Sequence, residues 1–160
     1  GQDEAAAEID LPAAPKAVEP AWTAGAPGPE IQATDDQGNA FTLASRRGRP
    51  FILVTGAFVD LDSHDLIRSL ESAAPEGMDV YILVVDKVLK LSLEELNRML
   101  KLGVKRSVML KGPSPFGRMV YGGTVTVVDR EGRVRHATQG TGVKAVQTAE
   151  FKKAVAEVAQ

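Results

Sequence analysis

The sequence lacks cysteine altogether, and that absence limits the chemistry of the chain more than any other feature. Without a thiol it can form no disulfide bond, no thiolate metal site and no cysteine nucleophile. It also has no run of about 18 apolar residues, so we expect neither a membrane span nor a targeting segment. No catalytic triad, phosphate-binding loop, zinc-ligand spacing or nucleic-acid motif is visible, and we expect no cofactor and no nucleic-acid partner.

Charge is nearly balanced along the chain as a whole, but it is unevenly placed. The formal net charge is −2, which predicts no general attraction to anionic polymers or membranes. Residues 1–30 contain six acids and only Lys16 as a base, whereas the remaining residues contain 15 acids and 18 bases. The first stretch is rich in Ala and Pro without helical or strand periodicity. We therefore predict a flexible acidic leader over residues 1–28 and a single domain over residues 29–160.

The hydrophobic pattern of residues 29–160 predicts an α/β fold. Turn-forming residues 35–38 lie between two short β-prone runs, which indicates an N-terminal hairpin. Nearly continuous apolar runs at 51–57 and 79–85, separated by a helical pattern, indicate a parallel βαβ unit. The remaining predicted elements are a capped helix from Ser92, a strand at 107–110, a brief helix up to Tyr121, a second hairpin at 124–138 and a closing helix at 143–158.

Two separated segments resemble the redoxin group of thioredoxin-like proteins, which includes TlpA- and ResA-like thiol–disulfide oxidoreductases and peroxiredoxins. The first is PGPEIQATDDQGNAFTLASRRGRPFILVTGAF, and the second is YGGTVTVVDREGRVRHATQG. They occur in the family's order and at a suitable distance. The resemblance implies a thioredoxin-like three-layer sandwich with a central mixed β-sheet and an N-terminal β-hairpin. It also implies a periplasmic or cell-envelope location in bacteria.

The chain departs from this family at the redox site. Aligning VTGAFVDLDSH with the family's cysteine motif places Asp60 and Ser63 at the two cysteine positions, and Val125 replaces the family's cis-proline. Thiol–disulfide exchange and peroxide reduction both need a thiolate, so neither activity is available to this chain alone. A cis bond before a non-proline residue costs about 2.5–4 kcal/mol, so we predict a trans Thr124–Val125 bond.

These departures favour a non-catalytic domain that binds or assembles with another protein, with the leader as a tether to a membrane or a larger complex. The rim of the former redox site is the predicted contact surface. It consists of Asp60, Leu61, Asp62, Ser63, Tyr121, Gly123, Thr124 and Val125. The two glycines at 122 and 123 are expected to let the backbone pass close to the loop of Asp60.

The crowded loop before the first helix allows a second interpretation. Asp60, Asp62 and His64, together with the distant His136, could hold a hard cation or make the protein a metal carrier. The simpler explanation is helix capping, in which Asp62 or Ser63 accepts hydrogen bonds from the first amides of the helix.

A run without acids, from Leu96 to Val128, gives one further candidate surface. It could form a cationic face for an acidic partner, or simply carry solvated charges near a sheet edge. Its basic residues are Arg98, Lys101, Lys105, Arg106, Lys111 and Arg118.

Overall fold

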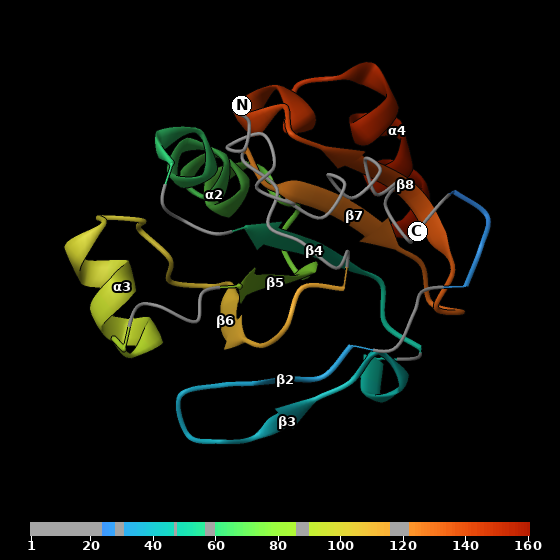
Figure 1. The fold of residues 1–160 in the computed structure, drawn as a ribbon. Helices are drawn as coiled ribbons and strands as arrows, with labels where there is room; N and C mark the ends of the chain where they lie inside the picture. The colour runs from blue at the N-terminus through green and yellow to red at the C-terminus, as the bar shows by residue number, and fades with distance from the viewer. Residues whose placement is uncertain (1–23, 28–30, 47, 57–59, 86–89, 116–121) are drawn as a thin grey trace, which may run out of the picture.

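The computed structural model describes residues 24–27, 31–46, 48–56, 60–85, 90–115 and 122–160. Within these ranges the chain folds around a seven-stranded mixed β-sheet of order β3-β2-β6-β5-β4-β7-β8. Figure 1 shows α2 and α4 on one side of the central strands, with the β2–β3 hairpin at the edge of the sheet beyond β6. The predicted α/β class, the mixed sheet and the thioredoxin-like fold are confirmed.

The centre of the sheet is the predicted parallel unit. Strand β4 (Phe51–Gly56) pairs in parallel with β5 (Asp79–Val84), and α2 (Leu61–Ala73) connects them. All six residues of β4 are buried, as the continuous apolar run predicted. Strand β6 (Val108–Lys111) extends the parallel part beyond β5.

Antiparallel hairpins complete the sheet on both sides. Strand β7 (Thr124–Val128) pairs with β4 and with β8 (Val134–Gln139), and β2 (Ala33–Thr34) pairs with β3 (Ala40–Phe41). In the β7–β8 turn, Asp129 Oδ1 accepts hydrogen bonds from the backbone amides of Glu131 and Arg133. Both predicted hairpins are confirmed, and their side-chain-capped turns explain why the short Asp and Gly motifs identified them.

Helix caps fix the ends of the remaining elements. Helix α3 (Leu93–Met99) begins with the predicted capping box of Ser92 and Glu95. The closing helix was predicted as one piece over 143–158, and that prediction is wrong. A 3₁₀ helix, η2 (Gly142–Val146), comes first, and α4 (Ala149–Val158) starts separately because Thr148 caps its first turn. A short 3₁₀ helix, η1 (Leu43–Arg46), precedes β4.

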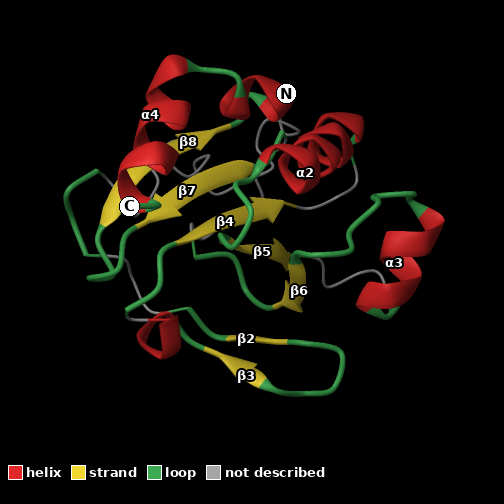
Figure 2. Ribbon diagram, turned by 180° about the vertical axis from the view of Figure 1, so that it is seen from behind, coloured by secondary structure: helices red, strands yellow, loops and turns green. Residues whose placement is uncertain are grey.

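Each face of the sheet has its own buried cluster. Residues of α2, α3 and α4 pack on the face that carries Ile52 and Val54, whereas Phe51 and Leu53 point to the other face with Phe41 and Tyr81. Seen from behind in Figure 2, the two longer helices, α2 and α4, cover the same side of the strands. None of the described helices combines the length and apolarity that a bilayer crossing requires.

The predicted leader falls mainly on residues 1–23, which lie outside the described residues, as does the brief helix predicted up to Tyr121. The leader and the domain boundary therefore stay predictions. Hydrogen bonds join Gly25 and Ala26 to the backbone of Val134 at distances of 2.7 and 2.9 Å. The chain thus already lies against β8 shortly before the predicted boundary at residue 29.

Candidate functional site

Asp60 is the centre of the site that replaces the dithiol. It lies beyond the carboxyl end of β4 and is the N-cap of α2, with extended backbone angles of φ −119° and ψ 147°. Its Oδ2 accepts from the backbone amide of Ser63 at 3.2 Å, and its Oδ1 accepts from the Ser63 hydroxyl at 2.7 Å. The capping explanation is confirmed, but the capping residue is Asp60 and not Asp62 or Ser63.

The same carboxylate also holds the loop that precedes β7. The backbone amide of Gly122 donates to Asp60 Oδ2 at 2.9 Å. Gly122 and Gly123 have φ values of +81° and +74°, which non-glycine residues rarely adopt. The prediction that these glycines bring the backbone close to the Asp60 loop is therefore confirmed. A redox site would leave its sulfur atoms open to a substrate. Here the carboxylate of Asp60 instead accepts hydrogen bonds from the protein's own backbone amides.

Two buried threonines close the site from below. Thr55 of β4 and Thr124 of β7 are paired across the sheet, and their hydroxyl groups hydrogen bond to each other. Both are at least 96% buried, with exposed fractions of 4% and 1%. Sequence analysis did not identify Thr55, although a hydroxyl inside the apolar run of β4 was a signal that it needs a polar partner.

Glycines in two neighbouring segments, residues 122–123 and 140–142, make the close packing around the site possible. The amide of Gly140 donates to the carbonyl of Gly123, and the amide of Gly142 donates to that of Gly122. A Cβ on Gly142 would lie 3.0 Å from Cβ of Asp62, so η2 rests directly on the first turn of α2. Sequence analysis missed Gly140 and Gly142, because only the fold brings them beside α2.

The predicted rim is mostly enclosed. Ser63, Gly123, Thr124 and Val125 are buried, and the side chain of Val125 is part of the apolar cluster beneath the helices. Asp60 is half-buried, Asp62 is exposed, and Leu61 is 76% exposed. Tyr121 lies outside the described residues. A partner could therefore reach Leu61 and Asp62, while Thr124 and Val125 support the site from inside.

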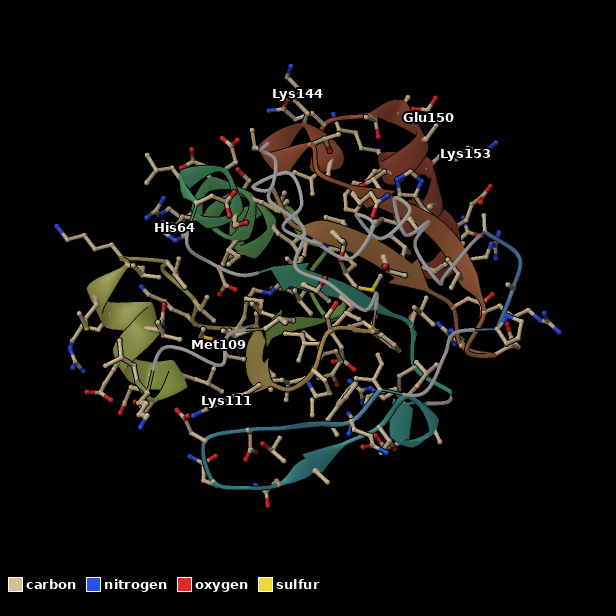
Figure 3. All side chains as sticks on the ribbon, viewed as in Figure 1. His64, Met109, Lys111, Lys144, Glu150 and Lys153 are labelled. Atoms are coloured by element: carbon tan, nitrogen blue, oxygen red, sulfur yellow. The ribbon has the colours of Figure 1, made fainter. Side chains whose placement is uncertain are left out.

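The predicted His/carboxylate metal site is not formed. The part of the chain that the structure describes contains no group of three or more His, Asp or Glu side chains placed to hold a metal ion. The carboxylate of Asp60 is occupied by amides and a hydroxyl, and His64 is buried on α2 (Figure 3). His136 packs edge-on against Phe151 of α4, where burial lowers its pKa and the charge of Glu150 partly opposes that shift.

The basic residues do not form a uniform cationic face. The guanidinium of Arg106 donates to the carbonyl oxygens of Ala74 and Pro75, so this side chain holds the loop between α2 and β5. Glu71, from α2, accepts hydrogen bonds from the amides of Lys105 and Arg106 within the acid-free run. Burial raises the pKa of Glu71, but hydrogen bonds from Arg106, Ser107 and Lys105 outweigh it and lower that pKa overall.

The other predicted basic residues are more scattered. Arg98, Lys101, Lys105 and Lys111 are exposed, and Arg118 lies outside the described residues. Lys101 follows α3 with φ +51°, and its carbonyl accepts a hydrogen bond from Arg68 of α2. The sheet edge expected near Lys111 is partly closed, because β2 pairs there.

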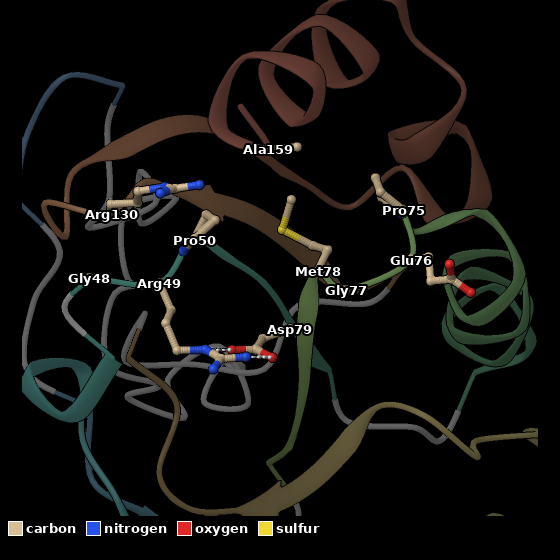
Figure 4. A pocket seen from close by; sticks show the side chains of 10 residues that line it. All are labelled: Gly48, Arg49, Pro50, Pro75, Glu76, Gly77, Met78, Asp79, Arg130 and Ala159. Atoms are coloured by element: carbon tan, nitrogen blue, oxygen red, sulfur yellow. Dashed lines mark hydrogen bonds and ion pairs between the residues drawn. The ribbon is translucent and has the colours of Figure 1, made fainter.

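A depression of about 250 Å³ lies at the opposite end of the sheet, where β4 and β5 begin (Figure 4). Arg49 donates to both carboxylate oxygens of Asp79, at 2.8 and 3.0 Å, and Arg130 and Glu76 also line the depression. The charged residues that line the depression are of both signs, and the guanidinium of Arg49 is already paired with Asp79. We assign it no binding role.

The fold and the site together define a thioredoxin-like domain without the thiols of that class. Solved structures with the same fold include a thio-disulfide isomerase from Thermus thermophilus, with a TM-score of 0.58, 21% identity, and coverage of 78% of this chain and 92% of that one. They also include a peroxiredoxin-like protein from Aquifex aeolicus, with a TM-score of 0.59, 13% identity and 89% coverage of both chains.

A third is the exposed lipoprotein thioredoxin Etrx1 of Streptococcus pneumoniae, with a TM-score of 0.52, 18% identity, and coverage of 78% of this chain and 99% of that one. No family model and no curated protein matches the chain by sequence. The structural neighbours are thioredoxin-like redoxins, and identities this low establish the shared fold only. Without cysteine, this chain cannot carry out the thiol chemistry that the names of its neighbours describe.

The alignment of Asp60 and Ser63 with the two cysteine positions can be tested by putting thiols there. The Asp60→Cys/Ser63→Cys double variant should form an intramolecular disulfide on mild oxidation, because the two side chains already meet at hydrogen-bonding distance. Thiol titration should show the loss of both free thiols, with no background from a cysteine-free chain. Asp62→Cys/Ser63→Cys is the matched control, since adjacent side chains at a helix start point apart. If both variants keep their thiols, the alignment is wrong.

Proposed function

We propose that this protein is a non-catalytic thioredoxin-like module that binds another protein in the bacterial cell envelope. The observation that carries the proposal is the hydrogen bonding of Asp60. Its carboxylate joins the start of α2 to the Gly122 loop and so fills the place where the fold usually exposes a reactive group. A site closed by its own polar groups stabilises a shape and offers no nucleophile.

The surface that remains open at this end of the sheet supports a docking role. Leu61 is a large apolar side chain, 76% exposed, on the first turn of α2, and Asp62 beside it is exposed as well. A single exposed leucine is ordinary on a protein surface. Leu61, however, lies at a helix end that the Asp60 cap and η2 hold in place. Little backbone freedom would therefore be lost if Leu61 anchored a partner.

The location in the envelope is supported more indirectly. One structural neighbour is an exposed lipoprotein, and the three neighbours described above come from bacteria. In this proposal the acidic leader acts as the tether, and the partner is a protein and not a nucleic acid.

The proposal has two testable parts, absence of catalysis and docking through Leu61. The unmodified chain should reduce insulin and consume peroxide no faster than buffer. In affinity capture from a bacterial envelope extract, the Leu61→Glu variant should retain about tenfold less of the partner protein than the unmodified chain. Met99→Glu is the matched control, because Met99 is 61% exposed and lies on α3, a different helix from the one that carries Leu61. Turnover above buffer, or equal capture by both variants, would contradict the proposal.

A further inference from the structure

A groove between α3, β6 and the β2–β3 turn is open where the edge of β6 is only partly covered. Strand β6 pairs with β5 along all four of its residues. On its other edge, the described part of the chain pairs with it only at Thr34 and Lys111. The hairpin then turns away, and the groove that it leaves has a volume of about 280 Å³. Figure 3 shows Met109 and Lys111 on this strand, between α3 and β2.

The walls of the groove are held by hydrogen bonds, so its shape exists before anything binds. Asp36 of the hairpin turn accepts from the backbone amides of Leu93 and Glu94 at 2.8 and 3.0 Å, which joins the turn to α3. Asn97 of α3 exchanges two hydrogen bonds with the backbone of Val104, at 2.8 and 3.0 Å. A preformed groove of this kind lowers the ordering cost of binding.

The lining of the groove combines acidic charge with exposed apolar surface. Among the described residues that line it, every ionisable one is acidic, namely Asp35, Asp36 and Glu94. Hydrogen bonds, chiefly from Asn39, lower the pKa of Asp35 and keep it ionised. Among the described residues, no base forms an ion pair with Asp35 or Glu94. Val108, on the strand edge, is 45% exposed.

We propose that this groove binds an extended, basic segment of a partner protein, which adds as a short strand along Val108–Leu110. The partly uncovered edge of β6 supplies backbone groups for such a strand. Val108 and Met109 supply apolar contact, and the three acids favour lysine or arginine in the segment. This surface is separate from Leu61, so peptide binding here can succeed or fail independently of the docking proposed above.

A second copy of this chain is the alternative occupant, and it is less favoured. Its far sheet edge, β8, carries Arg135, but that side chain already pairs with Glu157 and lies near Asp129. Pairing β8 of one copy with β6 of the next would also be a head-to-tail contact, which does not close into a dimer.

The test uses the full-length, isotope-labelled chain and a capped hexapeptide of alternating valine and lysine. NMR titration should show saturable shifts confined to residues 35–37, 93–94 and 108–110. Val108→Lys should weaken binding by about tenfold or more, because the new positive charge in the groove would repel the lysines of the peptide. Met99→Lys is the control, with the same new charge on an exposed α3 residue that does not line the groove. Both variants should unfold at the wild-type temperature, since neither residue is buried.

The contribution of charge is tested separately. Glu94→Gln should weaken peptide binding by about two- to fivefold, whereas Glu131→Gln, on the distant β7–β8 turn, should not change it. A hexapeptide of alternating valine and glutamate serves as the charge control, and the proposal is overturned if it binds as well as the valine–lysine peptide. It is also overturned if no shift saturates at millimolar peptide, or if the shifts fall around Leu61 instead. It is also overturned if the same shifts appear on raising protein concentration alone, which would identify a contact between copies of this chain.

Discussion

Replacing Asp60 by alanine is expected to lower the free energy of unfolding by about 2–3 kcal/mol. The substitution removes the N-cap of α2 and also leaves the amide of Gly122, a buried residue, without its acceptor. Loss of the cap frays the start of one helix, and loss of the second bond frees the loop that leads into β7. Urea unfolding followed by circular dichroism measures the combined effect.

Asp60→Asn is the matched control for this prediction. Asparagine is as good an N-cap as aspartate and keeps one acceptor oxygen, so its cost should be below about 1 kcal/mol. The comparison separates the geometry of the cap from the charge of the carboxylate. An Asp60→Ala variant with the same urea midpoint as the unmodified chain would show that the site is not held in the way described.

Gly122→Ala is the second substitution with a large expected effect, a loss of about 2–4 kcal/mol in the free energy of unfolding. Gly122 has φ +81°, and a Cβ there would lie 2.9 Å from the carbonyl carbon of Gly140 and 3.2 Å from the amide nitrogen of Gly142. Both contacts are with backbone atoms, which cannot rotate away as a side chain can. The loop would have to move, and the hydrogen bond to Asp60 would be lost with it.

Gly38→Ala isolates the part of this cost that comes from the backbone angle alone. Gly38 also has φ +81°, but a Cβ there has no atom within 4 Å. Its substitution should cost about 1–2 kcal/mol, the ordinary penalty for a left-handed residue. Equal midpoints for the two variants in thermal unfolding would mean that the approach of Gly122 to Gly140 is not tight.

The bonding of Asp60 also explains how a thioredoxin-like fold can do without its thiols. In this chain the start of α2, the loop before β7 and the η2 segment meet at one point. Asp60 and Ser63 bond to each other and to the neighbouring backbone, and Thr55 bonds to Thr124. The functional groups found there therefore stabilise the contact between these segments. The absence of thiol chemistry is therefore compatible with the thioredoxin-like fold, because these hydrogen bonds hold the segments together without cysteine.

Local sequence signals identified most of the elements because local interactions form them. The capping box of Ser92 and Glu95 is complete within four residues, and the Asp129 turn is closed by its own side chain. No cis peptide bond occurs among the described residues, which confirms the trans bond expected before Val125. The one helix that was wrongly predicted, over 143–158, failed because apolar periodicity continued across the break that Thr148 introduces.

Interactions between distant segments could not be found in the same way. Gly122 lies 62 positions from Asp60 along the chain, and Thr124 lies 69 positions from Thr55. Each of these residues has several plausible roles when only its neighbours in sequence are known. The acid-free run showed the same limit, because Glu71 comes to it from α2, which the sequence places more than 30 positions earlier.

The sequence by itself determined that this protein cannot carry out thiol chemistry, and it determined the class of fold. The absence of sulfur nucleophiles is a matter of composition, and strand and turn patterns act over a few residues. Only the tertiary structure decided which rim residues are enclosed, that Asp60 joins the start of α2 to the loop before β7, and that an acidic groove lies beside β6. Burial and hydrogen-bond partners depend on which segments the folded sheet brings together, and that information is not contained in any single stretch of the chain.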